Sequence, residues 1–315
     1  MTIHQQTAAG IDLGSNTFRL LVANSSAGSL KTLAKKMATV RLARGLEDNG
    51  LLDEEAIRKG LAVVRSFQET LTDYRPQSLR VCGTEALRQA RNSRLFLRKA
   101  EELLQQPIDI LSGEEEARLS LAGVLAGYTG SFPGPMLLVD VGGGSTELVF
   151  AVAPEGKTRA TSLGLGVVSL TEKFLAAPPL NPLSLDSLLT ESLNEAFDKL
   201  ALTKKEQPVI ITGCGGTATS MAALDLNLSA YDASKVHGYV LHNTSIEKLW
   251  NRLAVLPADE RNTLPCLGES RGEILPAGIR IYLMLLKLLQ RDRMRVSDTG
   301  LLEGILLSGL SHAAV

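Results

Sequence analysis

The stretch that decides the fold is GIDLGSNTFRLLVA at residues 10–23, in which a polar Gly-Ser-Asn turn joins two apolar runs. Such a pattern predicts a β-hairpin. It returns at residues 138–151 as LVDVGGGSTELVFA. Aligned without gaps, the two copies place Asp12 on Asp140 and Gly14 on Gly142, 128 residues apart. That spacing is too long for a solenoid repeat, so the sequence predicts two related halves.

Between the two copies, helix and strand signals alternate. Asp53 can cap a helix whose apolar residues, from Ile57 to Leu71, recur at spacings of three and four. Residues 79–86 predict a strand that ends in a turn, and Ser93 is a candidate helix cap. After a short predicted strand at residues 108–111, the chain enters the region that leads to the second hairpin.

Ser112 and Glu115 fit the S-x-x-E capping box of a helix that should run to about Ala126. The next stretch, residues 127–135, is rich in glycine and proline. Such a stretch favours a connector, so we expect a domain boundary there.

The second half continues the alternation. Leucines and a phenylalanine form an amphipathic stripe over residues 185–200, and residues 207–224 predict a strand, a glycine loop and a helix start. Further helices are expected around 278–289 and from about residue 299, with a strand at 293–298 between them. This order predicts an α/β protein with a central mixed sheet.

Composition narrows the class of protein. The chain has 315 residues, a length that suggests about two domains, and its 44% apolar and 21% charged residues are ordinary for a globular protein. A net charge of −1 and 4% aromatic residues argue against nucleic acid or an acidic membrane as partner. No signal peptide or membrane-spanning run is expected, and the three scattered cysteines favour a reducing compartment, so we expect a cytoplasmic protein.

Each hairpin copy carries an acid just before a glycine turn. Glycines allow positive φ angles, and successive N–H groups in such turns bind phosphate oxygens. Asp12 and Asp140 would face each other across a cleft and hold Mg²⁺ or Mn²⁺. The alternative is two ordinary hairpins with glycines for geometry. The candidate phosphate-binding residues of the turns are Gly14, Ser15, Asn16, Thr17, Gly142, Gly143, Gly144, Ser145 and Thr146.

A run of basic residues without an acid follows the strand and turn predicted at residues 79–86: Arg88, Arg91, Arg94, Arg98 and Lys99. Such a run could collect a chain of phosphates, since arginine forks pair with phosphate oxygens. The alternative is a solvated helix face, which we favour for Arg94, Arg98 and Lys99. Arg88 and Arg91 follow a turn, a better place for a ligand contact.

The sequence does not decide the roles of two further features. Glu114, Glu115 and Glu116 lie in the first turn of a predicted helix, where acids complement the helix dipole, and spacing alone does not single out a catalytic member. Residues 213–216 form a glycine loop that is either an anion site at a helix start or a tight turn. Cys214 lies in that loop, but no histidine nearby in sequence supports a nucleophile.

Three motifs carry a family resemblance: GIDLGSNTFRL, ILSGEEEARL and VDVGGGSTELV. Together they resemble the exopolyphosphatase/guanosine pentaphosphate phosphohydrolase (Ppx/GppA) family, over nearly the whole chain. The resemblance implies two duplicated RNase H-like domains of the actin/Hsp70/sugar-kinase superfamily around a central cleft. It implies domain I at residues 1–126, domain II at 127–298, and a closing helix at 299–315 that packs back on domain I.

The resemblance also implies roles for single residues. Glu116 matches the family's catalytic glutamate, which would deprotonate or orient the attacking water. Glu147 matches a second acid that aligns water or metal. Asp12 and Asp140 match acids that hold Mg²⁺, and Arg88 matches an arginine that contacts phosphate.

The chain also departs from the family pattern. Glu273 stands where the family usually has Asp, and Leu302 stands in place of an arginine, so any role of these two positions is in doubt. The chain ends where longer relatives continue into a helical region, which is the expectation for a short, two-domain member.

The resemblance implies metal-assisted hydrolysis of a terminal phosphoanhydride. We favour inorganic polyphosphate as substrate, because the basic run offers a path for a chain and the few aromatics offer little guanine stacking. The alternatives are hydrolysis of pppGpp to ppGpp, and a noncatalytic sensor of ppGpp or polyphosphate. A sugar-kinase-like or chaperone ATPase fits less well, because SGEEEARL is not a kinase motif. A homodimer is left open.

Overall fold

The structure of the protein is a computed structural model that describes residues 6–26, 29–128, 134–152, 158–175, 177–202, 210–268 and 271–312. The chain divides into two compact units, residues 1–129 with 299–315, and residues 130–298. The expected connector at 127–135 lies mostly outside the described residues. Within the described part of the chain, no helix is long and apolar enough to cross a membrane.

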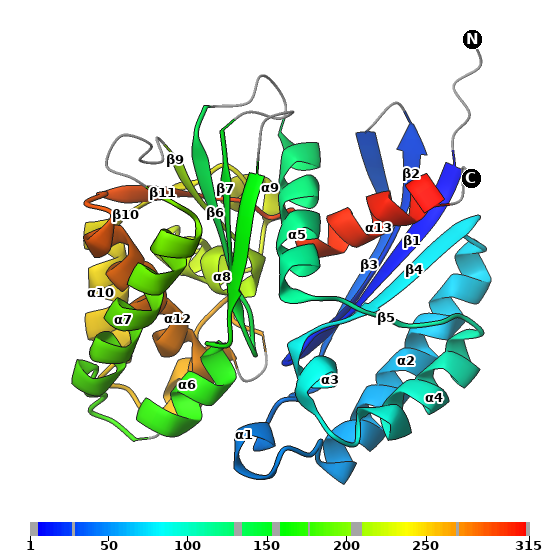
Figure 1. The fold of residues 1–315 in the computed structure, drawn as a ribbon, viewed down its shortest axis with the longest axis horizontal. Helices are drawn as coiled ribbons and strands as arrows, with labels where there is room; N and C mark the ends of the chain where they lie inside the picture. Colours follow the sequence, from blue (N-terminus) through cyan, green and yellow to red (C-terminus); the bar gives the residue numbers. More distant parts are fainter. Residues whose placement is uncertain are drawn as a thin grey trace. The chain divides into compact units, whose positions relative to one another are not determined.

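The first unit is built on a five-stranded mixed sheet with the order β3-β2-β1-β4-β5 (Figure 1). The predicted hairpin is its antiparallel β1–β2 pair, and β4 and β5 run parallel to β1. The strands are β1 (Gln6–Leu13), β2 (Thr17–Ser26), β3 (Ser29–Thr39), β4 (Ser78–Gly83) and β5 (Asp109–Ile110).

Helices cover both faces of this sheet because side chains alternate along β1. Ile11 and Leu13 pack with apolar residues of α2 and α4, while Ala8 packs with Leu302 and Leu306 of α13. Figure 1 shows α2 and α4 on one side of the sheet and α13 on the other. The helices are α1 (Leu46–Asn49), α2 (Glu54–Tyr74), α3 (Glu85–Gln89), α4 (Ser93–Leu104), α5 (Gly113–Gly127) and α13 (Leu301–His312).

The last helix, α13, packs against α5 and against β1 and β4 of the first unit. The approach to α5 is close. A Cβ atom on Gly123 would overlap the Gly300 carbonyl, and one on Gly304 would overlap the Leu119 carbonyl. The two helices therefore meet backbone to backbone.

The second unit has a six-stranded sheet with the order β10-β11-β9-β6-β7-β8. Its β6–β7 hairpin continues antiparallel into β8, and β9 and β11 run parallel to β6. The arrangement repeats that of the first unit, with β10 added at one edge. The strands are β6 (Met136–Val141), β7 (Thr146–Ala151), β8 (Thr158–Leu163), β9 (Ile210–Cys214), β10 (Val240–His242) and β11 (Arg293–Val296).

The core of the second unit centres on α12, which is buried along most of its length and contacts α6, α7, α8, α10 and α11. The apolar face of β6 and β7, with Val139 and Phe150, belongs to the same core. The helices are α6 (Val167–Phe174), α7 (Leu183–Lys199), α8 (Gly215–Asp225), α9 (Ala233–Val236), α10 (Asn243–Leu253), α11 (Ala258–Asn262) and α12 (Arg271–Leu288). The two similar sheets confirm the α/β fold class.

Helix ends show where local signals succeed and fail. Asp53 caps α2 as predicted and accepts from the N–H groups of Glu55 and Ala56. The prediction for Ser93 was wrong by one residue, because Asn92 is the N-cap of α4. The tail helix begins at Arg271 rather than near residue 278, and it contains Pro276, which lies beyond the first turn and therefore removes one backbone hydrogen bond of the helix.

Candidate active site

The predicted site residues of the first unit lie at the carboxyl ends of its three parallel strands. The turn at 14–16 follows β1, the loop to α3 follows β4, and the N-terminus of α5 follows β5. In open α/β sheets this end is where ligands bind. Thr84 N–H donates to the Leu13 carbonyl at 3.4 Å and Leu111 N–H to the Gly83 carbonyl at 3.0 Å, which joins the three loops.

The first turn is tight for a reason other than the one expected. Gly14 has no positive φ, and neither has any of Gly142, Gly143 and Gly144, so the expected left-handed turns are absent from these described positions. A Cβ on Gly14 would lie 2.7 Å from the Thr17 carbonyl oxygen. Glycine is needed here because the backbone folds closely on itself.

Ser15 and Asn16 are fixed by backbone hydrogen bonds. The Asn16 carbonyl accepts from Val40 and Arg41 N–H at 2.9 Å each, and the Ser15 carbonyl accepts from Ala43 N–H at 2.8 Å. The Ser15 hydroxyl oxygen also accepts, from Ala86 N–H at 3.1 Å. The turn is therefore held from two sides, and its hydroxyl proton stays available as a donor.

Asp12 is buried and pairs with Arg19, its register partner on β2. Arg19 Nε donates to Asp12 Oδ2 at 2.7 Å, and Arg19 Nη2 lies 2.5 Å from the same oxygen. One carboxylate oxygen of the predicted metal ligand is thus shared with a guanidinium.

Arg88 and Glu116, predicted separately, lie together. Arg88 Nη1 is 3.6 Å from Glu116 Oε2, and the Glu116 side chain is 9% exposed against 27% for Arg88. Arg88 also pairs with Glu85 of its own helix and donates to the Leu111 carbonyl, which lies just before α5. A buried carboxylate beside a half-buried guanidinium can present both charges to one ligand.

The second glycine turn, residues 142–145, is held against α6. Gly142 N–H donates to the Ser145 carbonyl at 2.9 Å, while the carbonyls of Gly142 and Gly143 accept from Val167 and Val168 N–H at 3.0 Å. The Thr146 hydroxyl donates to the Leu165 carbonyl at 2.7 Å. Since that hydroxyl proton is already bonded, Thr146 offers a phosphate less than the sequence suggests.

Asp140 and Glu147 are register partners on β6 and β7, and both are buried. Their carboxylates thus share one face of the sheet, an unfavourable pairing of like charges. Glu147 Oε1 accepts from the Ser162 hydroxyl at 2.8 Å. Among the residues that the structure describes, no three His, Cys, Asp or Glu side chains gather closely enough to hold a metal by themselves.

The glycine loop of undecided role adjoins Asp140. Residues 213–216 join β9 to α8, and Gly215 has a positive φ of 75°. A Cβ on Gly215 would overlap Asp140 Oδ1, and one on Gly216 would overlap the guanidinium of Arg271. The loop therefore places an acid and an arginine close to the N-terminus of α8.

Sequence reasoning missed three charged residues next to the predicted ones: Arg19, Glu85 and Arg271. Arg19 had a signal, because the gapless alignment of the two hairpins sets it against Glu147, a base against an acid. Glu85 had only its spacing of three from Arg88. Arg271 had none, because its place beside Gly216 depends on long-range packing.

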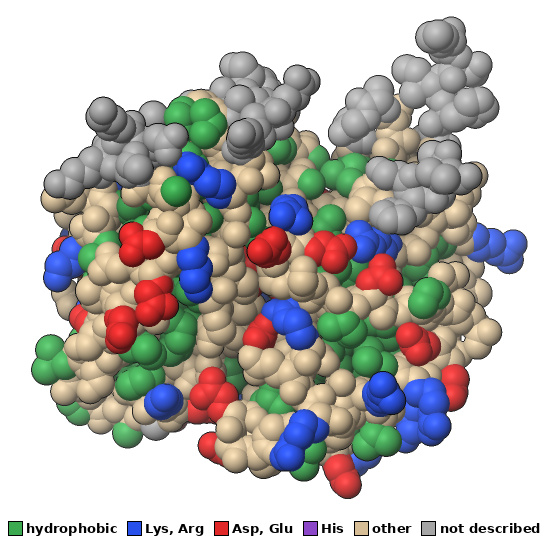
Figure 2. Space-filling model, in the orientation of Figure 1, with side chains coloured by type: hydrophobic (Ala, Val, Ile, Leu, Met, Phe, Trp, Pro, Cys, Tyr) green, Lys and Arg blue, Asp and Glu red, His purple; other side chains and the backbone are tan. Residues whose placement is uncertain are grey.

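The basic run divides as follows. Arg91 donates to the Asn49 carbonyl at 2.6 Å, which ties down the loop before α2. Arg98 lies on an exposed face 3.9 Å from Glu102. Figure 2 shows positive and negative side chains interspersed over the visible face of the molecule. Arg88 is thus the member of the run that lies beside Glu116.

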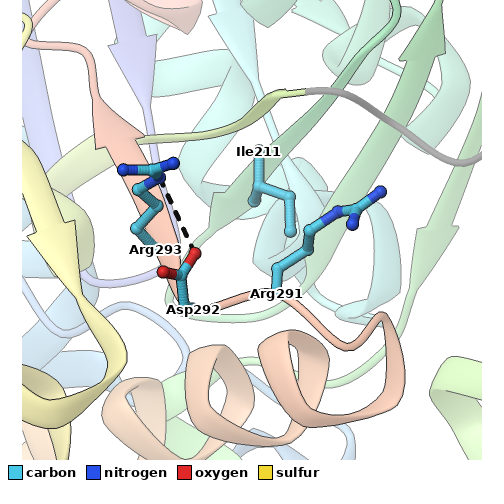
Figure 3. Close-up of a pocket in the computed structure, with 4 residues that line it drawn as sticks. All are labelled: Ile211, Arg291, Asp292 and Arg293. Atoms are coloured by element: carbon cyan, nitrogen blue, oxygen red, sulfur yellow. Dashed lines mark ion pairs between the residues drawn. The ribbon is translucent and has the colours of Figure 1, made fainter.

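A small pocket lies away from these residues. Its volume is about 270 Å³, and Ile211, Arg291, Asp292 and Arg293 line it (Figure 3). These residues stand at the starts of β9 and β11, whereas Asp140 pairs with Cys214 at the end of β9. The pocket therefore does not belong to the candidate site.

Two α/β units that each begin with a hairpin, an acid and a tight turn define a protein of the actin/Hsp70/sugar-kinase superfamily. A model of the Ppx/GppA phosphatase family matches residues 21–313, and the chain belongs to this family. The resemblance stated from the sequence is thereby confirmed.

Relatives and solved structures agree with this assignment. A guanosine-5'-triphosphate,3'-diphosphate pyrophosphatase of Vibrio vulnificus (strain YJ016) is 31% identical over 96% of this chain. The chain spans only 59% of that relative. The Aquifex aeolicus member of the Ppx/GppA family is 30% identical, with a TM-score of 0.80 over 98% of this chain and 99% of that one. An exopolyphosphatase-like protein of 26% identity has a TM-score of 0.91 and covers the same shares.

Proposed function

We propose that this protein is a phosphoanhydride hydrolase that releases the terminal orthophosphate of inorganic polyphosphate. The observation that carries the proposal is the buried Glu116 carboxylate 3.6 Å from the Arg88 guanidinium, at the ligand-binding end of a sheet. Family membership supports the reaction class. The proposal includes a cytoplasmic location, where thiols such as Cys82 stay reduced.

In this reaction, a water oxygen attacks the terminal phosphorus and its proton passes to Glu116. The bond to the bridging oxygen breaks, and that oxygen leaves with the shortened chain. Arg88 would pair with oxygens of the transferred phosphate, next to the base that activates the water. Phosphoryl transfer needs mainly positioning and charge stabilisation, which is what this pair supplies.

The glycine turns would hold the substrate. The Ser15–Asn16 turn is anchored through its carbonyls, which leaves N–H groups and the Ser15 hydroxyl proton to donate to phosphate oxygens. The turn at 142–145 is anchored in the same way by α6. In the proposal each turn donates backbone N–H groups to phosphate oxygens.

The family resemblance implies a divalent ion, and the acids fit one. Mg²⁺ usually keeps several waters and binds through one or two carboxylates plus substrate phosphates, so it does not need three protein ligands. Asp140 and Glu147, facing each other across β6 and β7, would supply such oxygens. Bound there, Mg²⁺ or Mn²⁺ would neutralise charge on the phosphate oxygens.

A second substrate, pppGpp, is favoured by two observations. A relative that is 31% identical over 96% of this chain is named a guanosine-5'-triphosphate,3'-diphosphate pyrophosphatase. The attack on a terminal phosphate would use the same residues. In addition, Arg91, which was expected to contact a polyphosphate chain, donates to the Asn49 carbonyl instead.

The test is phosphate release from polyphosphate, from pppGpp and from ATP, with Mg²⁺ present. The proposal expects the highest kcat/KM on polyphosphate. A higher value on pppGpp selects the second substrate, and ATP as the best substrate refutes both. Binding of polyphosphate or ppGpp without phosphate release by the wild-type protein would support the noncatalytic sensor.

A further inference from the structure

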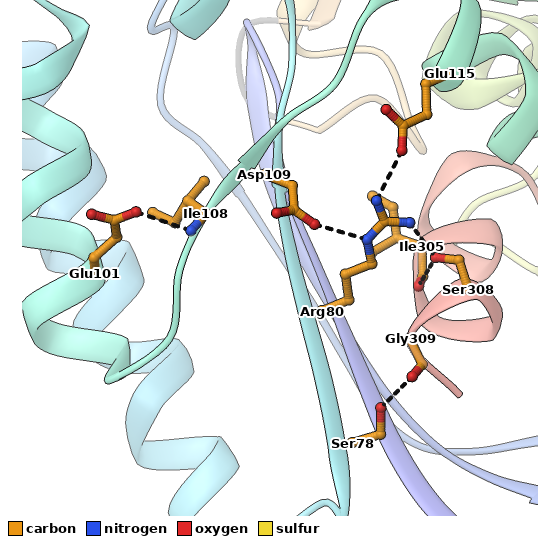
Figure 4. A network of polar contacts seen from close by, with 9 residues as sticks. All are labelled: Ser78, Arg80, Glu101, Ile108, Asp109, Glu115, Ile305, Ser308 and Gly309. Atoms are coloured by element: carbon orange, nitrogen blue, oxygen red, sulfur yellow. Dashed lines mark hydrogen bonds and ion pairs between the residues drawn. The ribbon is translucent and has the colours of Figure 1, made fainter. Parts of the chain in front are cut away.

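Arg80 on β4 lies at the centre of a polar network in the first unit (Figure 4). Its Nε donates to Asp109 Oδ2 at 3.0 Å, its Nη2 to Glu115 Oε1 at 2.9 Å and its Nη1 to the Ser308 hydroxyl at 2.7 Å. The side chain is 13% exposed. Burial opposes the charge of Arg80, but its bonds to Glu115 and Asp109 outweigh burial, and the pKa of Arg80 is raised.

Two of these partners mark the ends of one short segment. Asp109 lies on β5 and Glu115 in the first turn of α5, so a single guanidinium clamps the connection at residues 109–115 at both ends. The third partner, Ser308, lies on α13, and Ser78 of β4 donates to the Gly309 carbonyl of the same helix at 2.9 Å. The helix α13 thus holds β4 through both Ser78 and Arg80.

The hydrogen bond between Arg80 and Glu115 takes the place of one of the two bonds expected in the capping box of Ser112 and Glu115. Ser112 caps α5 and accepts from Glu115 N–H at 3.2 Å, as a capping box requires. The carboxylate of Glu115, which would otherwise return to the cap, instead bonds to Arg80. Arg80 therefore restrains the rotation of the first turn of α5 through a side chain, in addition to the cap.

The next residue along the helix is Glu116. Successive helix residues point about 100° apart, so restraining Glu115 on one side of α5 also sets the direction of Glu116. Glu116 is directed into the interior of the unit beside Arg88, while Glu115 stays half exposed. Arg88 itself donates to the Leu111 carbonyl inside the clamped segment.

We propose that Arg80 is a positioning residue for Glu116, holding residues 109–115 so that the Glu116 carboxylate stays beside Arg88. This inference rests on the proposed function, in which Glu116 activates water. Arg80 acts through Glu115 and the clamped segment. A planar fork with donors in fixed directions suits this task better than the single ammonium of lysine.

The competing explanation is that Arg80 serves only the stability of the unit by holding α13. The two explanations differ in what a second mutation does. If Arg80 acts through Glu116, its loss matters only while Glu116 is present. If it serves stability alone, its loss has the same effect with or without Glu116.

The experiment measures kcat and KM for phosphate release by Arg80→Gln, Arg80→Lys and Arg98→Gln, with melting curves to show that each variant is folded at the assay temperature. A misplacement of about 1 Å can cost about 100-fold in rate. We therefore expect Arg80→Gln to lower kcat by about 10- to 100-fold with KM nearly unchanged, and Arg80→Lys to recover part of the loss. Arg98→Gln removes the same charge from an exposed pair and should change neither.

The decisive comparison repeats Arg80→Gln in a Glu116→Gln background, in single-turnover phosphate release. A further loss of less than about twofold supports positioning, because residues that act as a unit are not additive. An equal loss in both backgrounds, or an unchanged kcat in the single variant, overturns it. If Arg80→Gln does not fold, Glu115→Gln replaces it under the same criteria. A wild-type protein without phosphate release refutes the proposed function itself.

Discussion

Asp12 and Arg19 face each other across the β1–β2 register, and Arg19 Nε donates to Asp12 Oδ2 at 2.7 Å. At the equivalent place in the second unit, Asp140 faces Glu147. The duplicated hairpins have therefore kept the first acid and diverged in its partner. The first unit balances its acid with a base, whereas the second places two acids together, the better setting for a cation.

Removing Arg19 should destabilise the first unit. The Asp12 side chain is 2% exposed, and Arg19→Gln takes away the cation beside it. Breaking a buried ion pair on one side costs about 3–5 kcal/mol, so we expect a loss of about 3 kcal/mol for this partly exposed pair. Urea unfolding measures it. The double variant Asp12→Asn, Arg19→Gln should recover most of the loss, and equal losses in the single and double variants would contradict the prediction.

Asp140 should govern metal dependence. Asp140→Asn removes one charge of the facing acids, so we expect the Mg²⁺ concentration for half-maximal phosphate release to rise while the melting temperature changes little. Titration of Mg²⁺ into both proteins measures the change. Asp259→Asn, on the exposed surface of α11, is the matched control. Full wild-type activity in excess EDTA would argue against any metal role.

The contact between α5 and α13 should not tolerate a methyl group. A Cβ on Gly123 would overlap the Gly300 carbonyl, and backbone atoms cannot step aside as a flexible side chain can. We expect Gly123→Ala to cost about 1–3 kcal/mol in the free energy of unfolding, the usual range for overpacking. Gly164→Ala is the control, because its Cβ would meet nothing within 4 Å. Similar unfolding midpoints for the two variants would count against the close contact.

Much of the fold could be predicted from the sequence, because the sequence signals that specify its main elements are local. The hairpin turns, the acid offsets and the Asp53 cap each depend on neighbouring residues, and β1, β2, β6, β7 and α2 form where those signals stand. The start of α12 did not follow, since Pro276 is a helix breaker by type and yet lies inside the helix. The face-to-face packing of Gly123 and Gly304 leaves no periodic trace in the sequence.

The site was predictable only in part. Sequence reasoning from spacing left Glu114, Glu115 and Glu116 equal, and the family resemblance selected Glu116. The structure separates them by contacts: Glu114 pairs with Arg118, Glu115 with Arg80 and Glu116 with Arg88. These partners come from other strands and helices for Glu115 and Glu116, so no local pattern could assign them.

Alkaline pH should weaken the fold. Burial raises the pKa of the Cys82 thiol to about 12, and burial with a hydrogen bond to Asp225 raises the pKa of Tyr239 to about 12. A folded-state pKa above the unfolded value contributes stability that is complete below the unfolded pKa and is lost as pH rises toward the folded one. The free energy of unfolding should therefore fall between about pH 9 and pH 12.

Urea unfolding at several pH values across this window measures the slope. The variants Cys82→Ala and Tyr239→Phe each remove one ionisable group, so each should make the decline with pH shallower than in the wild type. An unchanged slope in both variants would show that other groups cause the alkaline loss.

Glu116→Gln separates catalysis from helix-dipole stabilisation. If Glu116 only complements the dipole of α5, the change should cost about 0.3–1 kcal/mol of stability and leave turnover nearly intact. If Glu116 is the general base, kcat should fall by about 10²–10⁴-fold, or about 3–5.5 kcal/mol of barrier. KM should change little, because Gln keeps the shape of the side chain and removes a negative charge near a polyanion.

Glu114→Gln is the internal control, because Glu114 shares the first turn of α5 but pairs with Arg118 on the exposed surface at 3.1 Å. Losing that exposed pair should cost a few tenths of a kcal/mol. The measurement is kcat and KM for phosphate release by both variants, with thermal melts alongside. The two side chains differ in burial, since that of Glu116 is 9% exposed and that of Glu114 is 62% exposed. Equal, near-wild-type turnover in the two variants would remove Glu116 from the mechanism and leave the helix dipole as the reason for its position.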